Sequence, residues 1–160
     1  MAKALIGGTF DPITVGHVDI INRAAAVFDE VCAVIFNNSG KRTYFTAEQR
    51  FDMLKLACSG ISNVSCGMSD GLLAGYVTEH GIDVIVKGVR DSSDFGIEYQ
   101  MYVINNGFDS RIDTFLVPSR PEHIHVSSTV VREFLKYNTD IKDYVPVQVK
   151  KYIEECNQNK

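Results

Sequence analysis

The sequence lacks tryptophan and has only four prolines and four cysteines in 160 residues. None of its apolar runs approaches the ~18 residues of a membrane-spanning helix, so we expect no membrane partner. The cysteines are far apart and form no C-x-x-C pair, which indicates free thiols in a reducing compartment; they are Cys32, Cys58, Cys66 and Cys156. A lone Lys3 directly before the first apolar run is unlike a signal peptide. These features together predict a cytoplasmic protein.

Basic residues are also scarce relative to acidic ones, with 16 Lys and Arg against 20 Asp and Glu and a net charge of -4. This balance argues against a nucleic-acid partner, which would favour a large basic surface. It leaves room for a small anionic ligand held by a few convergent cations. With 45% hydrophobic residues and no linker-like stretch, residues 1–160 are predicted to form one folded domain.

Short apolar runs alternate with segments of helical period along the whole chain. Continuous apolar runs are typical of strands covered on both faces, as in a parallel sheet; they lie at 4–6, 31–36, 64–68, 84–86 and 114–117. Helical spacing or capping sequences occupy the intervals, around 18–28, 46–58, 72–80, 97–107 and 127–137, and again after Pro146. The alternation predicts an α/β fold: a single Rossmann-like, doubly wound domain with a five-stranded parallel sheet and helices on both faces.

The stretch GGTFDPITVGH, residues 7–17, follows the first predicted strand and leads into a helix. Gly7 and Gly8 allow a ligand to approach the backbone closely. The helix start adds free N–H groups and a positive dipole end, which favour phosphate. Thr14 and His17 are three residues apart and share one face there. The alternative interpretation is a glycine turn in which Thr14 caps the helix and His17 is a surface residue.

Further candidates for anion binding follow later strands. Lys87 and Arg90 flank a glycine after the fourth apolar run, and residues 127–129 (SST) combine hydroxyls with a predicted helix start. Lys41 lies in a polar loop, where a cation is usually solvated. His123 and His125 lack further ligands at metal-site spacing, so no metal site is predicted. No G-x-G-x-x-G, P-loop or nucleophile–base pattern is present, which disfavours an ordinary dinucleotide site and covalent catalysis.

Two motifs carry a resemblance to a known superfamily. Thr14-Val15-Gly16-His17 is similar to the (H/T)-x-G-H motif of the nucleotidyltransferases, and the segment 126–132 (VSSTVVR) is similar to their I-S-S-T-x-x-R motif. The blocks GGTFDPITVGHVDII, TAEQR, KGVRDSSDF and VSSTVVRE occur in the order and spacing of the bacterial phosphopantetheine adenylyltransferases. The similarity runs from Ala4 to about Ile153.

The resemblance implies transfer of AMP from ATP to 4'-phosphopantetheine, giving dephospho-coenzyme A and pyrophosphate by in-line attack without a covalent enzyme intermediate. It implies catalytic roles for His17, Thr9, Lys41 and Arg90. The acceptor substrate would contact Thr9, Lys41, Leu73 and Lys87. ATP would contact Gly8, Thr9, Phe10, His17, Gly88, Val89, Arg90, Glu98, His123, Ile124, His125, Val126, Ser127, Ser128 and Thr129.

The family further implies Mg²⁺ that arrives with ATP, a homohexamer, and feedback by coenzyme A. Two other enzyme or binding classes remain open. A sister nucleotidyltransferase acting on nicotinamide mononucleotide or a small phosphorylated alcohol would share the same motifs. A nucleotide-sensing protein without catalysis would be expected to have lost His17, Lys41 or Arg90, all of which are present. An RNA-binding fragment of a synthetase-like fold is disfavoured by the acidic balance.

Overall fold

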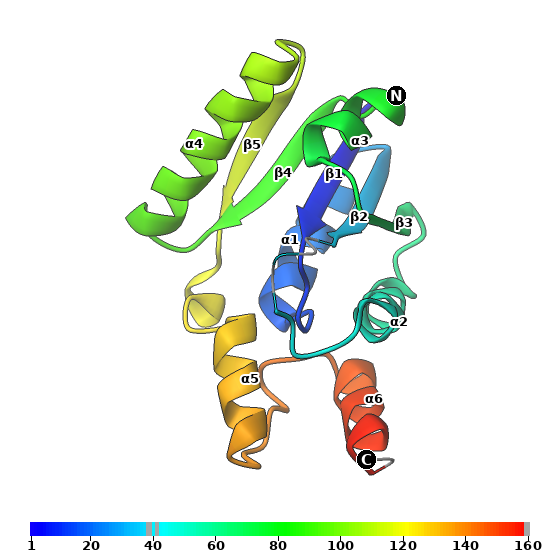
Figure 1. The fold of residues 1–160 in the computed structure, drawn as a ribbon, viewed down its shortest axis with the longest axis vertical. Helices are drawn as coiled ribbons and strands as arrows, with labels where there is room; N and C mark the ends of the chain where they lie inside the picture. Colours follow the sequence, from blue (N-terminus) through cyan, green and yellow to red (C-terminus); the bar gives the residue numbers. More distant parts are fainter. Residues whose placement is uncertain (38–39, 41, 159–160) are drawn as a thin grey trace.

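The computed structural model describes residues 1–37, 40 and 42–158, which form a five-stranded parallel sheet with helices on both faces (Figure 1). The strand order is β3-β2-β1-β4-β5, the arrangement of a doubly wound sheet. The strands are β1 (Lys3–Gly8), β2 (Glu30–Phe36), β3 (Val64–Ser69), β4 (Val84–Val89) and β5 (Asp113–Pro118). The predicted fold class is confirmed.

Six α-helices and one short 3-10 turn occupy the described residues between and after the strands. They are α1 (Val15–Ala25), α2 (Ala47–Cys58), α3 (Leu73–Glu79), α4 (Ser92–Phe108), α5 (Ser128–Lys136), α6 (Val147–Gln158) and the 3-10 turn Pro121–His123. In the described part of the chain, no helix is both long and apolar enough to cross a membrane.

Local capping sequences set where the helices begin. The Thr46 hydroxyl accepts a hydrogen bond from the Gln49 backbone N–H, and the Gln49 side chain accepts one from Thr46 N–H, so that α2 starts with a complete capping box. Asp91 accepts from the backbone N–H groups of Ser93 and Asp94 and starts α4. Helix α4 therefore begins before the apolar stripe that predicts it.

The sheet separates two apolar cores. Ala4 and Ile6 of β1 face the side covered by α1 and α2, whereas Leu5 faces the side covered by α3. Helices α5 and α6 extend the first core past the carboxyl ends of the strands (Figure 1). After β1 the chain builds β2 and β3 on one side, and it then crosses to β4 and β5 on the other. A crevice is therefore expected at the carboxyl ends of β1 and β4.

Several elements differ from the sequence expectation. Strand β1 includes Gly7 and Gly8, and α1 ends at Ala25, three residues before the predicted end. Strand β4 continues past the apolar run through Lys87 to Val89, because these residues still pair with β5. Helix α4 includes Gly107 and ends one residue later, and its apolar stripe does not join a core: Ile97 is 58% exposed and Ile104 is 63% exposed.

Candidate active site

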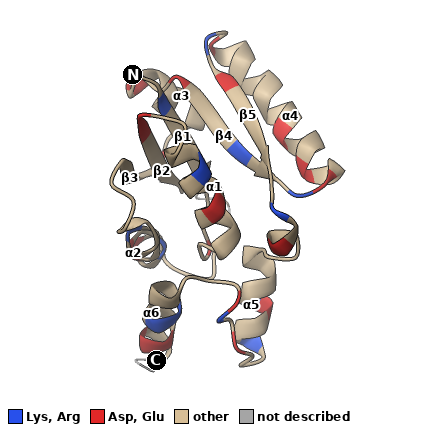
Figure 2. Ribbon diagram, turned by 180° about the vertical axis from the view of Figure 1, so that it is seen from behind, with Lys and Arg blue, Asp and Glu red and all other residues tan. Residues whose placement is uncertain are grey.

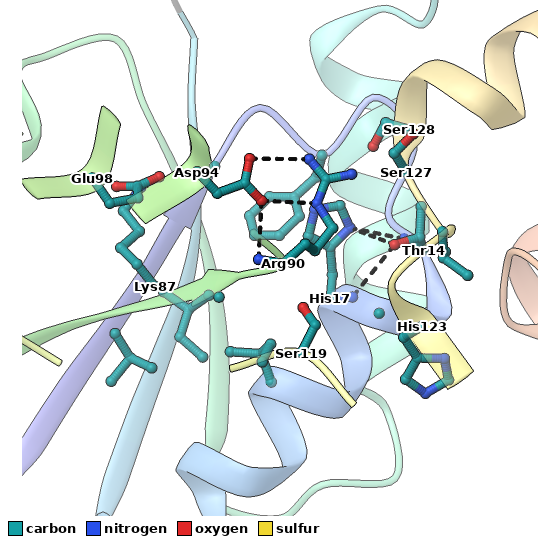
Figure 3. Close-up of a pocket in the computed structure, with 18 of the residues that line it drawn as sticks. Thr14, His17, Lys87, Arg90, Asp94, Glu98, Ser119, His123, Ser127 and Ser128 are labelled. Carbon is teal, nitrogen blue, oxygen red and sulfur yellow. Dashed lines mark hydrogen bonds and ion pairs between the residues drawn. The ribbon is translucent and has the colours of Figure 1, made fainter. Parts of the chain in front are cut away.

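A cavity of about 360 Å³ opens at the carboxyl edge of the sheet, where β1 and β4 end (Figure 3). Its walls come from the β1–α1 turn, the end of β4, the first turns of α4, and the segment that leads into α5. The cavity therefore lies at the switch point of the strand order, the place where doubly wound sheets bind their ligands. Segments more than a hundred residues apart in sequence meet in it.

His17 is held in the cavity wall by a capping box at the start of α1. The Thr14 backbone N–H donates to His17 Nδ1 over 3.0 Å, and the His17 backbone N–H donates to Thr14 Oγ1 over 3.4 Å. Because Nδ1 accepts this hydrogen bond, the neutral ring carries its proton on Nε2. The Thr14 cap of the alternative interpretation is thus present, but the same cap orients His17 into the cavity wall, so His17 is not a plain surface residue. Phosphate binding at this turn stays a prediction.

The surroundings of His17 keep its ring neutral. Burial, followed by the positive charges of Arg90 and Lys87, lowers the pKa of His17 from 6.5 to about 4. A protonated ring would also place an N–H on Nδ1, opposite the N–H of Thr14. His17 therefore offers a hydrogen-bond donor at neutral pH and adds no full positive charge.

Two cations reach the cavity, Lys87 of β4 and Arg90 directly after it, and each is paired with a carboxylate of α4. Arg90 Nε donates to Asp94 over 2.9 Å and Arg90 Nη2 donates to the same carboxylate over 3.2 Å (Figure 3). This hydrogen bonding is the main cause that raises the pKa of Arg90 and lowers that of Asp94. Lys87 Nζ lies 3.7 Å from Glu98 and donates to the Gly7 carbonyl over 3.2 Å. The two cations are thus fixed in place before any ligand arrives.

The start of α5 closes the opposite wall. The Ser127 hydroxyl caps the helix by accepting from Val130 N–H, and the Ser128 hydroxyl donates to the Pro12 carbonyl over 2.7 Å. The N–H groups of a first helical turn have no acceptor within the helix. Those of Ser128 and Thr129 therefore add donors beside the cavity, at the positive end of the helix dipole.

The donors of the cavity suit phosphate oxygens better than a metal ion. Within the described ranges, no group of three or more His, Cys, Asp or Glu side chains could hold a metal. Asp94 and Glu98, the two carboxylates in the cavity wall, already face Arg90 and Lys87. A hard cation would therefore be bound mainly through ligand phosphates, with the chain supplying few of its ligands.

Comparison with known proteins identifies the family to which the chain belongs. Residues 5–134 match the sequence family described as cytidylyltransferase-like. The chain is 44% identical over 146 residues to a phosphopantetheine adenylyltransferase of Symbiobacterium thermophilum, a match covering 91% of this chain and 90% of that protein. The chain belongs to the phosphopantetheine adenylyltransferase family.

A solved structure supports the fold independently. A protein from Vibrio parahaemolyticus described as a nicotinate-nucleotide adenylyltransferase superposes with a TM-score of 0.74. The superposition covers 97% of this chain and 93% of that one, at 20% sequence identity. At that identity the likeness concerns the architecture alone, which is Rossmann-like in both.

Most of the site residues expected for a phosphopantetheine adenylyltransferase meet in the cavity wall. These are Gly8, Phe10, His17, Lys87, Gly88, Arg90, Glu98, His123, Val126, Ser127, Ser128 and Thr129. Three others are placed elsewhere: Val89 is the last residue of β4, Ile124 is 52% exposed, and His125 packs edge-on against Tyr144.

The predicted contacts to the acceptor substrate are the most dispersed. Thr9 lies outside the cavity wall, directly after β1, and Leu73 starts α3 on the other face of the sheet. Leu73 is nevertheless close to the turn, because a side chain at Gly7 would come within 3.0 Å of it and within 2.7 Å of Phe36. This crowding explains the glycine at the end of β1. Lys41 lies outside the described residues, and its role stays a prediction from the sequence.

Several residues of the site were not expected from the sequence. Asp94 and Ser119 line the cavity, and Asp94 holds Arg90. The spacing of four residues between Arg90 and Asp94 across a helix start is a signal that could have identified the pair. Arg50 and Arg132 hold the backbone of the Thr9–Pro12 turn from two different helices. Both arginines end motifs that carry the resemblance, TAEQR and VSSTVVR, but nothing local in the sequence pointed to these two contacts.

Proposed function

We propose that the protein transfers AMP from ATP to the phosphate of 4'-phosphopantetheine, giving dephospho-coenzyme A and pyrophosphate. The observation that carries this proposal is the cavity itself. It combines the Nε2–H of His17, the start of α5 and two cations at the end of β4, Lys87 and Arg90, at one edge of the sheet. Such a set of donors serves two substrates that both carry phosphate and repel one another.

In this reaction an oxygen of the acceptor phosphate attacks the α-phosphorus of ATP, while the bond between the α-phosphorus and the bridging oxygen of pyrophosphate breaks. No side chain of the protein becomes bonded to phosphorus. Positioning and charge stabilisation are sufficient for such transfers. His17 donates from Nε2 to the phosphate oxygens on which charge develops. Arg90 and the N–H groups at the start of α5 bind the phosphates that leave as pyrophosphate.

The remaining predicted contacts complete the two substrate sites. Thr9, Lys41 and Lys87 bind the phosphate of the acceptor, and Leu73 contacts its pantetheine arm. Gly8, Phe10, Gly88, Val89 and Glu98 contact the nucleotide, together with residues 123–126. The nearness of Leu73 to Gly7, and of the Lys87 ammonium to the Gly7 carbonyl, supports an acceptor site beside the end of β1.

We further propose that Mg²⁺ enters with ATP and neutralises phosphate charge when bound. Chelation with EDTA should stop pyrophosphate release without shifting the melting temperature, because the described residues hold no metal-binding cluster. Added Mg²⁺ should restore the activity. A large loss of thermal stability on chelation would contradict this view and would indicate a structural metal.

A homohexamer is the assembly that we propose. The support comes from α4, whose exposed side chains include Phe95, Ile97, Tyr99, Met101, Val103, Ile104 and Phe108. Exposed apolar side chains gathered on one helix are typical of a protein interface, and α4 is free of charge along much of its length (Figure 2). We infer a cytoplasmic location from the four cysteines, which are all free thiols, and regulation by coenzyme A, which shares its pantetheine arm with the acceptor.

The deciding experiment measures pyrophosphate release from ATP and Mg²⁺ with a panel of acceptors. The panel contains 4'-phosphopantetheine, unphosphorylated pantetheine, nicotinamide mononucleotide and glycerol 3-phosphate. Release with the first acceptor alone is the expected result. Release with one of the other phosphorylated acceptors would keep the chemistry and replace the substrate. No pyrophosphate release with any of the four acceptors, in protein that still binds ATP, would favour a nucleotide sensor.

A further inference from the structure

Arg50 of α2 is the largest of the fully buried side chains, with 1% of its surface exposed. Removing a guanidinium from water is costly unless it is well paired. In the part of the chain that the structure describes, no carboxylate lies within ion-pair distance of it, and its Nε has no hydrogen-bond partner. Burial lowers the pKa of Arg50, and the charge of Asp11 opposes this effect. A hydrocarbon side chain would fill the same space at a lower desolvation cost, so packing does not explain the arginine.

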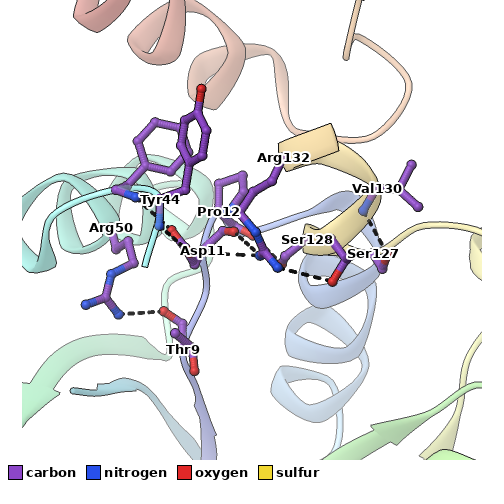
Figure 4. A network of polar contacts seen from close by, with 11 residues as sticks. Thr9, Asp11, Pro12, Tyr44, Arg50, Ser127, Ser128, Val130 and Arg132 are labelled. Atoms are coloured by element: carbon purple, nitrogen blue, oxygen red, sulfur yellow. Dashed lines mark hydrogen bonds and ion pairs between the residues drawn. The ribbon is translucent and has the colours of Figure 1, made fainter. Parts of the chain in front are cut away.

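The two terminal nitrogens of Arg50 connect the ends of two strands. Nη1 donates to the Thr9 carbonyl over 2.8 Å (Figure 4), and Nη2 donates to Asn37 Oδ1 over 2.6 Å. Asn37 follows β2, and its amide nitrogen donates in turn to Asp70, which follows β3, over 3.2 Å. One guanidinium therefore fixes Thr9 relative to the carboxyl ends of β2 and β3.

The other side of the same turn is held by α5. Arg132 Nη1 donates to the Asp11 carbonyl over 2.7 Å, and the Ser128 hydroxyl donates to the Pro12 carbonyl (Figure 4). Arg132 Nη2 also donates to the Thr129 hydroxyl, beside the phosphate-binding start of α5. Arg132 thus acts on the nucleotide side of the Thr9–Pro12 turn, whereas Arg50 acts on the β2 side, away from the cavity at β1 and β4.

We propose that Arg50 is a positioning residue for the acceptor substrate, holding Thr9 and the end of β2 in the arrangement that receives the acceptor phosphate. The inference rests on the proposed function, which assigns Thr9 to that phosphate. The two hydrogen-bond acceptors, the Thr9 carbonyl and Asn37 Oδ1, lie in different directions and require the planar fork of arginine. A lysine has one ammonium nitrogen and cannot occupy both nitrogen positions. The contacts are part-buried and act through Thr9 and Asn37, so Arg50 itself need not touch either substrate.

The test is the Arg50→Lys variant, with the acceptor and the nucleotide measured separately. We expect the KM for 4'-phosphopantetheine to rise about tenfold or more, since a small misplacement of a binding group weakens the contact strongly. The Kd for ATP, measured by calorimetry without acceptor, should stay within about twofold, because Thr9 is only one of many predicted nucleotide contacts and Arg132 holds the turn on the side of α5. Normal ATP binding also shows that the variant is folded.

Met53→Ala provides the matched control for loss of stability, because Met53 is fully buried on the same helix and makes no polar contact to the turn. We expect this variant to melt at a lower temperature with an unchanged KM for the acceptor. An equal rise in KM for Met53→Ala and Arg50→Lys would overturn the positioning role. If Arg50→Lys does not fold, Asn37→Ala serves as the second variant, because it removes one of the two hydrogen-bond acceptors of Arg50. It should also raise the KM for 4'-phosphopantetheine, and an unchanged KM would overturn the proposal.

The wild-type protein separates this inference from the function on which it rests. Absence of turnover with 4'-phosphopantetheine in the wild type would overturn the proposed function and this inference with it. If the wild type is active, two results with Arg50→Lys would overturn only the role of Arg50. One is an unchanged KM for the acceptor substrate, and the other is an ATP Kd that rises as much as that KM.

Discussion

His17 uses its two ring nitrogens for different tasks. Nδ1 accepts the Thr14 N–H and so completes the capping box of α1, while Nε2–H remains available to a ligand. The same residue therefore stabilises the helix and, in the proposed reaction, donates to the phosphate. The two contributions can be separated by substitutions that imitate one nitrogen at a time, because the amide oxygen of asparagine occupies a position similar to Nδ1.

His17→Asn should keep the cap and lose the donor. We expect kcat to fall by about 10²–10³, the usual cost of removing one preorganised donor, with a melting temperature close to that of the wild type. His17→Ala should lose as much activity and should also melt at a lower temperature, since the cap is gone. Steady-state kinetics and thermal denaturation measure both effects. Near-normal turnover in His17→Asn would contradict the role assigned to Nε2.

The low pKa of His17 predicts how stability depends on pH. The folded protein binds the proton near pH 4, whereas an unfolded chain binds it near the ordinary value of 6.5. The contribution of His17 is therefore complete above pH 6.5, is lost as the pH falls from 6.5 to about 4, and is constant below that. Urea denaturation at several pH values should show the wild type losing stability relative to His17→Asn over this interval, so that a difference that is small at neutral pH opens in favour of the variant.

A direct titration tests the cause of the shift. The ring signals of His17 in an NMR titration should give a midpoint near 4 in the wild type. Removing a nearby positive charge with Lys87→Met should raise that midpoint, because Lys87 is one of the two cations that disfavour the protonated ring. A midpoint near 6.5 in the wild type would contradict both the burial and the charge argument.

Contacts between nearby residues in the sequence were predictable, and contacts across the fold were not. The capping residues Thr14 and Thr46 have partners three residues away, so their patterns are visible in the sequence. Arg50 contacts residues that are 41 and 13 positions away, and these contacts depend on which strand lies beside β1. A buried arginine in an amphipathic helix pattern is indistinguishable from an exposed one until the strand order is known.

Strand β4 and helix α1 touch at Gly88, directly beside the cavity. A methyl group at this position would lie 3.0 Å from Ile20 Cγ1 and 3.3 Å from its Cδ1. Gly88→Ala should therefore push α1, which carries His17, away from β4. We expect a lower melting temperature together with a loss in kcat/KM.

The partner substitution provides the control for this contact. Ile20→Ala alone should destabilise the protein by leaving a cavity, because Ile20 is buried. In the double variant the two side chains no longer collide, so its stability and activity should be better than the sum of the single effects predicts. Simple additivity would show that the contact at Gly88 does not set the position of α1.

The boundaries of the elements show which physical signals the sequence carries. Apolar runs marked all five strands. Burial explains the runs of β1, β2 and the first half of β4, whereas the edge strands β3 and β5 have no fully buried residue. The last residues of β4 were missed since Lys87 and Gly88 serve the site and do not follow the composition of a buried strand. The stripe of α4 was visible as a pattern, but the pattern does not say whether it faces the sheet or the outside.

The apolar face of α4 predicts assembly of the whole molecule. Light scattering coupled to size exclusion should give six times the chain mass of 17.8 kDa. Ile104→Glu should reduce that mass by placing a charge on the exposed face of α4. Val147→Glu is the matched control, because Val147 is 62% exposed and Ile104 is 63% exposed, but Val147 starts α6. A wild-type monomer at micromolar concentration would overturn the proposed hexamer.

The pairing of both cavity cations with carboxylates of α4 has a consequence for selectivity inside a cell. Arg90 and Lys87 are already neutralised by Asp94 and Glu98, so an incoming anion has to replace an existing partner. Inorganic phosphate, which is abundant and carries little charge per molecule, gains little from that exchange. A triphosphate that reaches the start of α5 at the same time gains much more. The site is thereby protected from being filled by the commonest small anions around it.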